Sequence, residues 1–510
     1  MQEMVETTSL LTRKRVRVYL APEGIAITQR RAFTAWEEPR LIPFGDVQAV
    51  EAKAAGRRWA VELSLPQGPL TVPGLLESEA LWLAGLIGEE LGMRARRADR
   101  RFTERVPLDR LQAEIDGLLS PGEREAAAVV DFLLLQAVHH QASDVHFDPF
   151  HSMLRLRFRI DGLLSDVAQI GLGVHPRVLA RLKVLAKLAV FRHDIPQEGR
   201  TVVESGSRTI DLRVSVLPTI HGEKAVVRLF DSTRAIFKLG DLGMSSHTLA
   251  RYLDLVNRPQ GTILLTGPAN SGKTTTLYST LTHLYEQRRN LSNIVTVEDP
   301  VEYDLEVISQ TQINPAMGLT FATGLRTVLR QDPEVIMVGE IRDAETAEIA
   351  VRAGLTGHLI FSTAHARSAP GVFARIVEMG VEPFLVASSV TGVMEQRLVR
   401  RVCPGCARPY QPDAAVLRRA GIRAEAGASF IHGVGCDRCA GSGYSGRTGI
   451  FALVLVDEPI RELVMAKAAL AALEEAASRT SPGLLAEGRE RVAAGVTTVE
   501  ELLRVVEPAA

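Results

Sequence analysis

The sequence has few aromatic residues, few cysteines and no long apolar run, and each shortage narrows what the protein can be. No run of about 18 or more apolar residues occurs, so we expect no membrane-spanning helix. The first residues, MQEMVETTSLLTRKRVRVYL, lack the charged-then-apolar order of a signal peptide, and we therefore expect a cytoplasmic protein that meets any membrane through a partner. The formal net charge of −1 and the 5% of aromatic residues argue against a nucleic-acid channel but leave room for a local basic patch.

The four cysteines form two C-x-x-C pairs, Cys403 with Cys406 and Cys436 with Cys439. In a reducing compartment, such pairs indicate a metal site rather than disulfides. Four thiolates complete a tetrahedral zinc site, which has no open position and is therefore structural. The nearby His432 leaves a mixed ligand set open, and two redox-active pairs are the alternative to zinc.

A chain of 510 residues is too long for one compact core, so we expect three or four domains. Residues 1–95 alternate apolar and polar positions between Gly and Pro, and then show helical spacing over residues 77–93. This pattern predicts a small β-rich module closed by a helix, similar in pattern to pleckstrin-homology-like domains. The apolar positions of the helix are Leu81, Leu83, Leu86, Ile87 and Leu91.

Three further segments follow this module. Residues 96–142 are charged and helical in pattern, which predicts a helical connector. Residues 143–235 alternate apolar and polar residues, for example over 154–162 and 210–219, and this predicts the half-buried strands of a second β-rich domain. Over residues 240–510, short apolar runs that end in small or polar residues alternate with helical segments, which is typical of an α/β domain with buried parallel strands.

The stretch TGPANSGKTTTLYS contains the spacing G-x-x-x-x-G-K-T between a predicted strand, TILLT, and a predicted helix. Glycines allow the backbone amides of such a loop to wrap a phosphate. Lys273 should reach the β- and γ-phosphates, and Thr274 should place its hydroxyl on Mg²⁺. The sequence therefore predicts an ATP site. The expected binding residues are Gly267, Pro268, Ala269, Asn270, Ser271, Gly272, Lys273, Thr274 and Thr275.

Two acidic clusters that follow predicted strands are candidates for binding the metal and activating water. TVEDPVE offers Glu298, Asp299 and Glu302, and VIMVGEIRD offers Glu340 and Asp343. Hydrolysis needs one carboxylate near Mg²⁺ and another that polarises water. The alternative is that these acids merely cap strands and pair with arginines.

Two histidines, His358 and His365, bracket the predicted strand in GHLIFSTAH. A single histidine in such a place is usually a packing residue. Two of them near acidic residues are candidates for sensing a γ-phosphate, and the sequence alone does not choose between these readings.

Together these motifs resemble the type II secretion and type IV pilus assembly ATPases, the GspE/PilB group. The resemblance runs from about Ala142 to the C-terminus. It rests on ASDVHFDP (142–149), FRIDG (158–162), PQEGR (196–200), RVSVLPTIHGEKAVVRLF (213–230), the P-loop, TVEDPVE, GLTFATGLRTVLRQDPEVIMVGEIRD (318–343), ETAEIAVRAGLTGHLIFSTAH (345–365), both C-x-x-C pairs, GYSGRTGIF (443–451) and GVTTVEELLRVV.

The resemblance implies a RecA-like P-loop ATPase core of α/β class, preceded by an α+β, PAS-like domain and the N-terminal β-rich module. It places a tetracysteine zinc insertion at residues 400–445. It also implies a homo-hexameric ring that hydrolyses ATP at subunit interfaces on the cytoplasmic face of an inner-membrane machine. There the ring would act with a platform protein and a membrane-anchored docking protein to drive pilin-like subunits into a fibre.

The resemblance also implies roles for single residues in the ATPase core. Glu302 matches the general base of the family, and Glu340 matches the acid that acts at Mg²⁺ through water. His358 and His365 match the histidine box.

In the preceding β-rich domain, Arg213 and Arg228 match arginines that reach the γ-phosphate, against the alternative of solvated strand arginines. The resemblance further places a hinge near residues 231–240.

Several positions depart from the family pattern. Ala269 and Asn270 replace Thr and Gly in the P-loop, and because Asn tolerates a positive φ, we expect the loop still to form. The segment after His365 also differs from the family pattern, and so does Ala452. These two departures bear on the turnover rate rather than on the fold. The N-terminal 95 residues differ from the helical domain usual in the family, which suggests a different docking partner.

Three alternatives to a secretion motor remain at this stage. One is a RecA-like ATPase that translocates nucleic acid, and another is a scaffold that binds ATP with little turnover. A retraction ATPase fits poorly because the four-cysteine insertion is not expected there.

Overall fold

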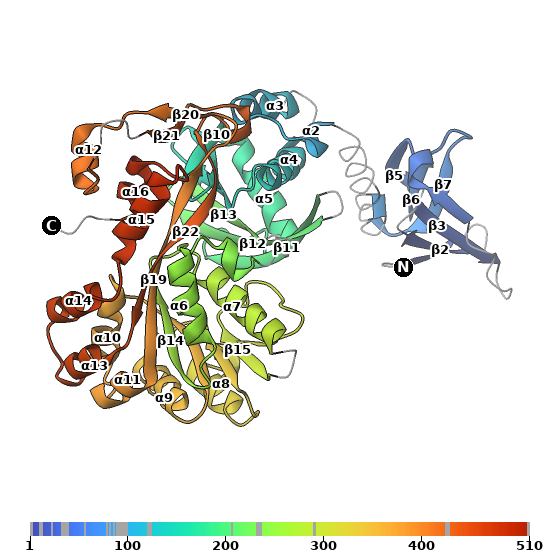
Figure 1. The fold of residues 1–510 in the computed structure, drawn as a ribbon. Coiled ribbons are helices and arrows are strands. Elements are labelled where there is room, and N and C mark those ends of the chain that lie inside the picture. The colour runs from blue at the N-terminus through green and yellow to red at the C-terminus, as the bar shows by residue number, and fades with distance from the viewer. Residues whose placement is uncertain are drawn as a thin grey trace. The chain divides into compact units, whose positions relative to one another are not determined.

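The computed structural model describes residues 4–9, 14–21, 24–31, 40–55, 58–77, 80, 83–84, 87, 100–119, 125–205, 208–230, 237–288, 292–423 and 429–506 (Figure 1). The chain divides into two compact units, Met1–Arg105 and Val106–Ala510. Within the described ranges, no helix has both the length and the apolar composition needed to cross a bilayer.

The described part of the N-terminal unit contains two antiparallel sheets, one of four strands and one of three. Alternating apolar residues such as Val18, Ile25, Val61 and Leu63 turn inward and form a core of their own. The strands are β1 (Met4–Ser9), β2 (Lys14–Ala21), β3 (Gly24–Arg31), β4 (Arg40–Pro43), β5 (Ala49–Ala55), β6 (Arg58–Ser64) and β7 (Leu70–Leu75), with the 3-10 turn η1 (Phe44–Asp46) and the short helix α2 (Arg100–Thr103).

Only part of the helix predicted after these strands can be compared with the structure. Leu83 and Ile87 are buried in the same core. Leu81, Leu86 and Leu91 lie outside the described residues.

The second unit begins with short helices and then a sheet. Among its described residues, six strands form one antiparallel sheet in the order β10-β9-β8-β13-β12-β11. The predicted alternation is confirmed, because Leu154, Leu156 and Phe158 are buried on one strand and Leu212 and Val214 on another. The elements are η2 (Leu108–Arg110), α3 (Leu111–Leu118), α4 (Glu125–His139), β8 (Asp144–Pro149), β9 (Met153–Ile160), β10 (Leu163–Gly171), η3 (Leu172–Val174), α5 (His175–Leu185), β11 (Gln197–Ser205), β12 (Arg208–Thr219) and β13 (Gly222–Phe230).

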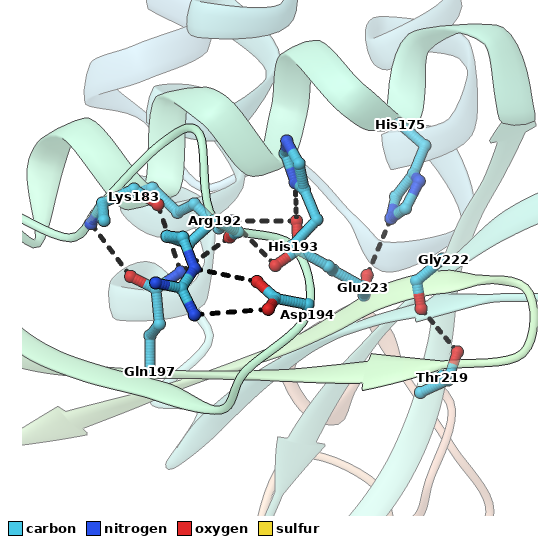
Figure 2. Close-up of polar contacts among 10 residues, drawn as sticks. His175, Lys183, Arg192, His193, Asp194, Gln197, Thr219, Gly222 and Glu223 are labelled. Carbon is cyan, nitrogen blue, oxygen red and sulfur yellow. Dashed lines mark hydrogen bonds and ion pairs between the residues drawn. The ribbon is translucent and has the colours of Figure 1, made fainter.

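A buried ion pair fixes the loop that leads from α5 into β11. The Lys183 ammonium, fully buried, contacts the Glu223 carboxylate at 2.7 Å and donates to the Arg192 carbonyl at 2.6 Å (Figure 2). His193 Nδ1 lies 2.7 Å from the other Glu223 oxygen, and Gln197 bonds back to the Arg192 carbonyl. These contacts fix the chain at Gln197, where β11 begins. They therefore help to position Arg200, which lies three residues farther along the same strand.

The remaining residues form the α/β core that the sequence predicts. In the described ranges, seven strands make one sheet in the order β16-β15-β17-β18-β14-β19-β22, and all neighbours are parallel except β22. Strands β14, β15, β17 and β18 are buried at every position, which is why they appear in the sequence as continuous apolar runs.

The elements of this core, in chain order, are η4 (Leu239–Asp241), α6 (Ser246–Val256), β14 (Gly261–Thr266), α7 (Lys273–Gln287), β15 (Ile294–Glu298), β16 (Ser309–Gln312), η5 (Pro315–Met317), α8 (Phe321–Val328), β17 (Val335–Val338), α9 (Ala344–Leu355), β18 (Leu359–Ala364), α10 (Ala369–Glu378), α11 (Pro383–Ser389), β19 (Val390–Val402) and β22 (Tyr444–Leu455). Most of the predicted hinge, residues 231–236, lies outside the described residues.

Between the long strands β19 and β22, the chain makes an excursion that carries all four cysteines, and short helices follow it to the C-terminus. The elements are β20 (Ala407–Tyr410), α12 (Ala414–Arg419), β21 (Phe430–Gly433), η6 (Asp437–Cys439), α13 (Glu458–Met465), α14 (Leu470–Ser478), α15 (Gly483–Ala493) and α16 (Val499–Val505).

Candidate functional site

The predicted site residues meet at one edge of the parallel sheet. The P-loop follows β14, Glu302 follows β15, Glu340 follows β17 and His365 follows β18. Because the carboxyl ends of parallel strands share an edge, these segments line one cavity of about 280 Å³. The lining residues are Ala269, Lys273, Thr274, Leu277, Glu298, Asp299, Pro300, Glu302, Phe321, Met337, Gly339, Glu340, Thr363 and His365.

The P-loop connects β14 to α7 as the spacing predicts. Asn270 has a φ of 61°, the left-handed conformation that asparagine was expected to tolerate at this position. Gly272, which precedes the helix, has a φ of 89° and is also left-handed. The replacement of the usual glycine by asparagine therefore leaves the loop formed.

Lys273 lies at the centre of the loop. Its ammonium donates to the carbonyls of Gly267 and Pro268, each at 2.9 Å. Burial lowers the pKa of Lys273, Glu340 opposes this and Arg397 adds to it. A half-buried cation held only by neutral carbonyls is suited to an anionic ligand such as phosphate. Thr274, the next residue, also lines the cavity.

Glu340 is linked to the other acidic cluster through an arginine that sequence reasoning missed. Arg342 donates to Glu340 Oε1 at 2.5 Å and to Asp299 Oδ2 at 3.2 Å, and its guanidinium lies over the Phe321 ring. His365 Nε2 lies 3.6 Å from the other Glu340 oxygen. In the sequence, Arg342 could have been recognised by its position in VGEIRD, two residues after Glu340.

Glu302 is the half-buried acid of the site. Burial raises its pKa, and Arg228, Arg213 and Arg200 partly offset that rise while Glu298 adds to it. A carboxylate with a raised pKa in a cavity is a stronger proton acceptor than an ordinary glutamate. The described structure places Glu302 in the same cavity as Lys273 and Glu340.

Two of the remaining acids have structural roles. Glu298 is buried and accepts hydrogen bonds from Tyr278 and Thr296. Asp343 caps α9 by accepting from the backbone N–H of Thr346 at 2.8 Å. Glu298 is thus bonded to hydroxyl groups, and Asp343 caps a helix rather than a strand.

Arginines of the β-rich domain influence the electrostatics of Glu302 in this cavity. Arg213 on β12 pairs with Glu198 at 2.6 Å, and Arg228 on β13 pairs with Asp144 at 2.9 Å. Both lower the pKa of Glu302, as does Arg200 on β11, which sequence reasoning did not single out. In the sequence, Arg200 is the last residue of the motif PQEGR, and this was the available indication of its role.

The two histidines are separated by the length of one strand. His365 follows the carboxyl end of β18 and lines the cavity. His358 precedes the amino end, where its Nδ1 lies 3.2 Å from the Ala353 carbonyl and its own carbonyl accepts from Gly261. Six strand residues span roughly 20 Å, so the structure does not bring His358 to this cavity.

The four cysteine sulfurs lie within 4.8 Å of one another. Thiolates at about 2.3 Å from one zinc ion lie ~3.8 Å apart in a tetrahedron. The observed Sγ–Sγ distances are 3.9 Å for Cys403–Cys436, 3.8 Å for Cys406–Cys439 and 3.7 Å for Cys436–Cys439. The cluster therefore fits zinc. His432 is instead stacked on the Tyr410 ring, with centroids 4.6 Å apart.

Comparison with known proteins agrees with this geometry. Residues 122–504 match the family model described as "Type II/IV secretion system protein". The chain is 43% identical to the Type II secretion system ATPase E of Vibrio cholerae over 76% of this chain and 77% of that protein. It is 42% identical to the Type II secretion system protein HxcR of Pseudomonas aeruginosa over 88% and 93%, respectively. It is 41% identical to the Type IV pilus assembly ATPase PilB of Thermus thermophilus over 77% of this chain and 44% of that protein.

Solved structures show the same fold at low sequence identity. The Legionella pneumophila ATPase DotB aligns with a TM-score of 0.56 and 18% identity, covering 76% of this chain and 98% of DotB. The pilus retraction motor PilT aligns with a TM-score of 0.50 and 22% identity, covering 73% of this chain and 96% of PilT. These findings confirm the RecA-like fold and the resemblance to the GspE/PilB group. The chain belongs to the type II/IV secretion system protein family, and it is an ATPase.

Proposed function

We propose that this chain is the cytoplasmic ATP-hydrolysing motor of a type II secretion system. The observation that carries the proposal is the single cavity shared by Lys273, Thr274, Glu302 and Glu340, which combines a phosphate grip with two separate carboxylates. We favour a type II secretion system over a type IV pilus system because the matched region spans 93% of the length of HxcR but 44% of the length of PilB. A type IV pilus machine is the second candidate.

In this proposal, the P-loop amides and Lys273 hold the β- and γ-phosphates of ATP. Thr274 and Glu340 are the residues that would hold Mg²⁺, which neutralises phosphate charge when bound. The Glu302 carboxylate takes a proton from water as the water oxygen attacks the γ-phosphorus and ADP leaves. Arg213 and Arg228 offset the charge that develops on the γ-phosphoryl oxygens. His365 senses that group through Glu340.

The motor is proposed to act as a homo-hexamer bound to the inner membrane through a platform protein and a membrane-anchored docking protein. Closure and reopening of the β-rich domain over the nucleotide would pass movement to the platform. The low aromatic content and near-zero net charge support a protein partner rather than a nucleic acid. Zinc held by the four cysteines would be structural.

The steady-state ATPase rate, measured against protein concentration with particle size in parallel, tests the proposal. We expect specific activity to rise as rings assemble. Glu302→Gln should lower the rate by roughly 10²- to 10⁴-fold, because the amide cannot accept the proton from water. Asp343→Asn is the control, since Asp343 caps α9 and lies outside the residues that line the cavity, and it should retain more activity.

A different result would contradict the motor. If assembled wild-type rings bind ATP tightly but turn over at background rate, the departures at Ala269 and Asn270 have made a nucleotide-dependent scaffold instead.

A further inference from the structure

Gln396 is a fully buried polar side chain that no sequence motif pointed to. It lies on β19, which runs parallel beside β14, with Glu395 paired to Thr266. Gln396 is therefore beside Gly267, the first residue of the P-loop. Its side chain is 1% exposed, and it does not line the nucleotide cavity. Gln396 thus contacts the P-loop from β19, outside the residues that line the cavity.

The side-chain amide of Gln396 holds one peptide of the P-loop. Its Nε2 donates to the Ser271 carbonyl at 2.7 Å. In a trans peptide, the C=O and the following N–H are coplanar and point in opposite directions. Because the Ser271 carbonyl points at β19, the N–H of Gly272 points to the opposite face of the loop. Amides on that face are the ones that can bind phosphate.

Gln396 supports the loop at two points, once through its backbone carbonyl and once through its side chain. A Cβ added at Gly267 would lie 2.5 Å from the Gln396 carbonyl oxygen, and one at Gly272 would lie 3.2 Å from Gln396 Nε2. The loop is thus packed directly against this one residue. A displacement of Gln396 would therefore change the packing at Gly267 and at Gly272, the two ends of the loop.

Burial of Gln396 carries a cost that packing alone does not explain. Its Oε1 is buried and has no hydrogen-bond partner in the described structure. An unsatisfied buried amide oxygen is unfavourable, and a methionine of similar size would fill the same space without it. The contact that accompanies this cost is the hydrogen bond to Ser271.

We propose that Gln396 is a positioning residue for the nucleotide: its amide fixes the Ser271–Gly272 peptide so that the Gly272 N–H faces the phosphates. This inference rests on the proposed function, because it requires ATP and ADP to bind in this loop. It assigns no direct contact between Gln396 and the nucleotide.

The test is the affinity of the full chain for MgADP, by calorimetry, with melting temperatures recorded for each variant. Gln396→Met should weaken MgADP binding roughly tenfold, the effect of losing one orienting hydrogen bond. Gln136→Met is the matched control. Gln136 is equally buried and accepts a hydrogen bond from Val106, away from the loop. We expect it to leave MgADP affinity within about twofold of wild type.

Gln396→Glu separates positioning from packing, because its size is unchanged. At pH 8 the carboxylate repels the Ser271 carbonyl, and binding should be weak. At pH 6 a buried carboxyl regains its proton and can donate again. The affinity relative to wild type at the same pH should therefore recover.

Equal MgADP affinity in wild type, Gln396→Met and Gln396→Glu would overturn the proposal. So would a Gln396→Glu defect that is the same at pH 6 and pH 8, since packing loss does not titrate. This pH comparison decides the question even if Gln396→Met does not fold. Failure of the proposed function looks different: Lys273→Ala would bind MgADP as well as wild type.

Discussion

Glu302 shows how opposing effects set the chemistry of one side chain. Burial raises the pKa of its carboxyl, and the three arginines Arg228, Arg213 and Arg200 lower it. The raised pKa makes Glu302 a better proton acceptor from water, while the arginines favour the ionised form of its carboxyl. The balance between these effects depends on residues from two different domains.

This balance predicts the pH dependence of hydrolysis. A general base must be ionised, so activity falls as pH drops through the pKa of Glu302, at a higher pH than for an ordinary glutamate. Arg228→Gln removes the largest of the three lowering charges and should move this acid limb to still higher pH. It should also lower the plateau by roughly 10³-fold or more if Arg228 acts as an arginine finger.

The measurement is a pH–rate profile for each variant, scaled to its own plateau. Arg228→Lys is the control, because it keeps the charge and should keep the position of the limb. An acid limb at the same pH in wild type and Arg228→Gln would show that Glu302 does not control the profile.

The residues of the site were predictable to different extents. Lys273, Glu302 and Glu340 each follow a buried strand within a few residues, so local pattern was enough. Gln396 and Arg200 were not found, because their contacts to the site come from strands far away in sequence. His358 was grouped with His365, although the direction of β18 separates them. Strand direction was readable from the sequence and would have made that distinction.

At the scale of elements, the strands β19 and β22 connect the nucleotide site to the cysteine cluster. Up to Glu395, β19 lies between β14 and β22, and from Gln396 onward its strand pairing in the described ranges is with β22. The chain leaves β19 at Cys403 and returns through Cys439 to β22. The four-cysteine cluster thus closes the end of this two-stranded extension. From this position in the fold, we expect the cluster to stabilise the two-stranded extension rather than the whole ATPase domain.

Removal of one zinc ligand tests that view. Cys403→Ser should reduce bound zinc from one ion per chain to nearly none, because three thiolates bind far more weakly. Amide hydrogen exchange should rise in residues 397–447, while MgADP affinity changes less than about twofold, since the sheet around β14 is held by its own core. Zinc content by elemental analysis and exchange by mass spectrometry give the two readouts.

His432→Ala is the control for this experiment. Because His432 is stacked on Tyr410 and lies outside the sulfur cluster, zinc content should be unchanged. A loss of zinc in His432→Ala would mean a mixed ligand set, and protection at 397–447 without zinc would mean that the metal is not structural.

At the scale of the whole molecule, two units carry separate hydrophobic cores. Among the described residues, the core cluster of the N-terminal unit runs from Val18 to Ile87, and the two clusters around the parallel sheet run from Leu239 to Ala477. The general division into a β-rich module and an ATPase was predictable, because composition and periodicity change along the chain. The pairing of distant strands into sheets was not, since periodicity does not specify partners.

Separate cores predict that the second unit folds without the first. A chain of residues 106–510, begun with a methionine, should unfold cooperatively, retain one zinc ion and bind MgADP within about twofold of the full-length affinity, because every residue that lines the nucleotide cavity lies in this unit. Circular dichroism melts, elemental analysis and calorimetry check the three points. The same chain carrying Lys273→Ala is the control for specific binding. If the shortened chain aggregates or loses MgADP affinity although zinc is retained, the N-terminal unit is part of the ATPase fold rather than an attached module, and a role confined to docking would be wrong.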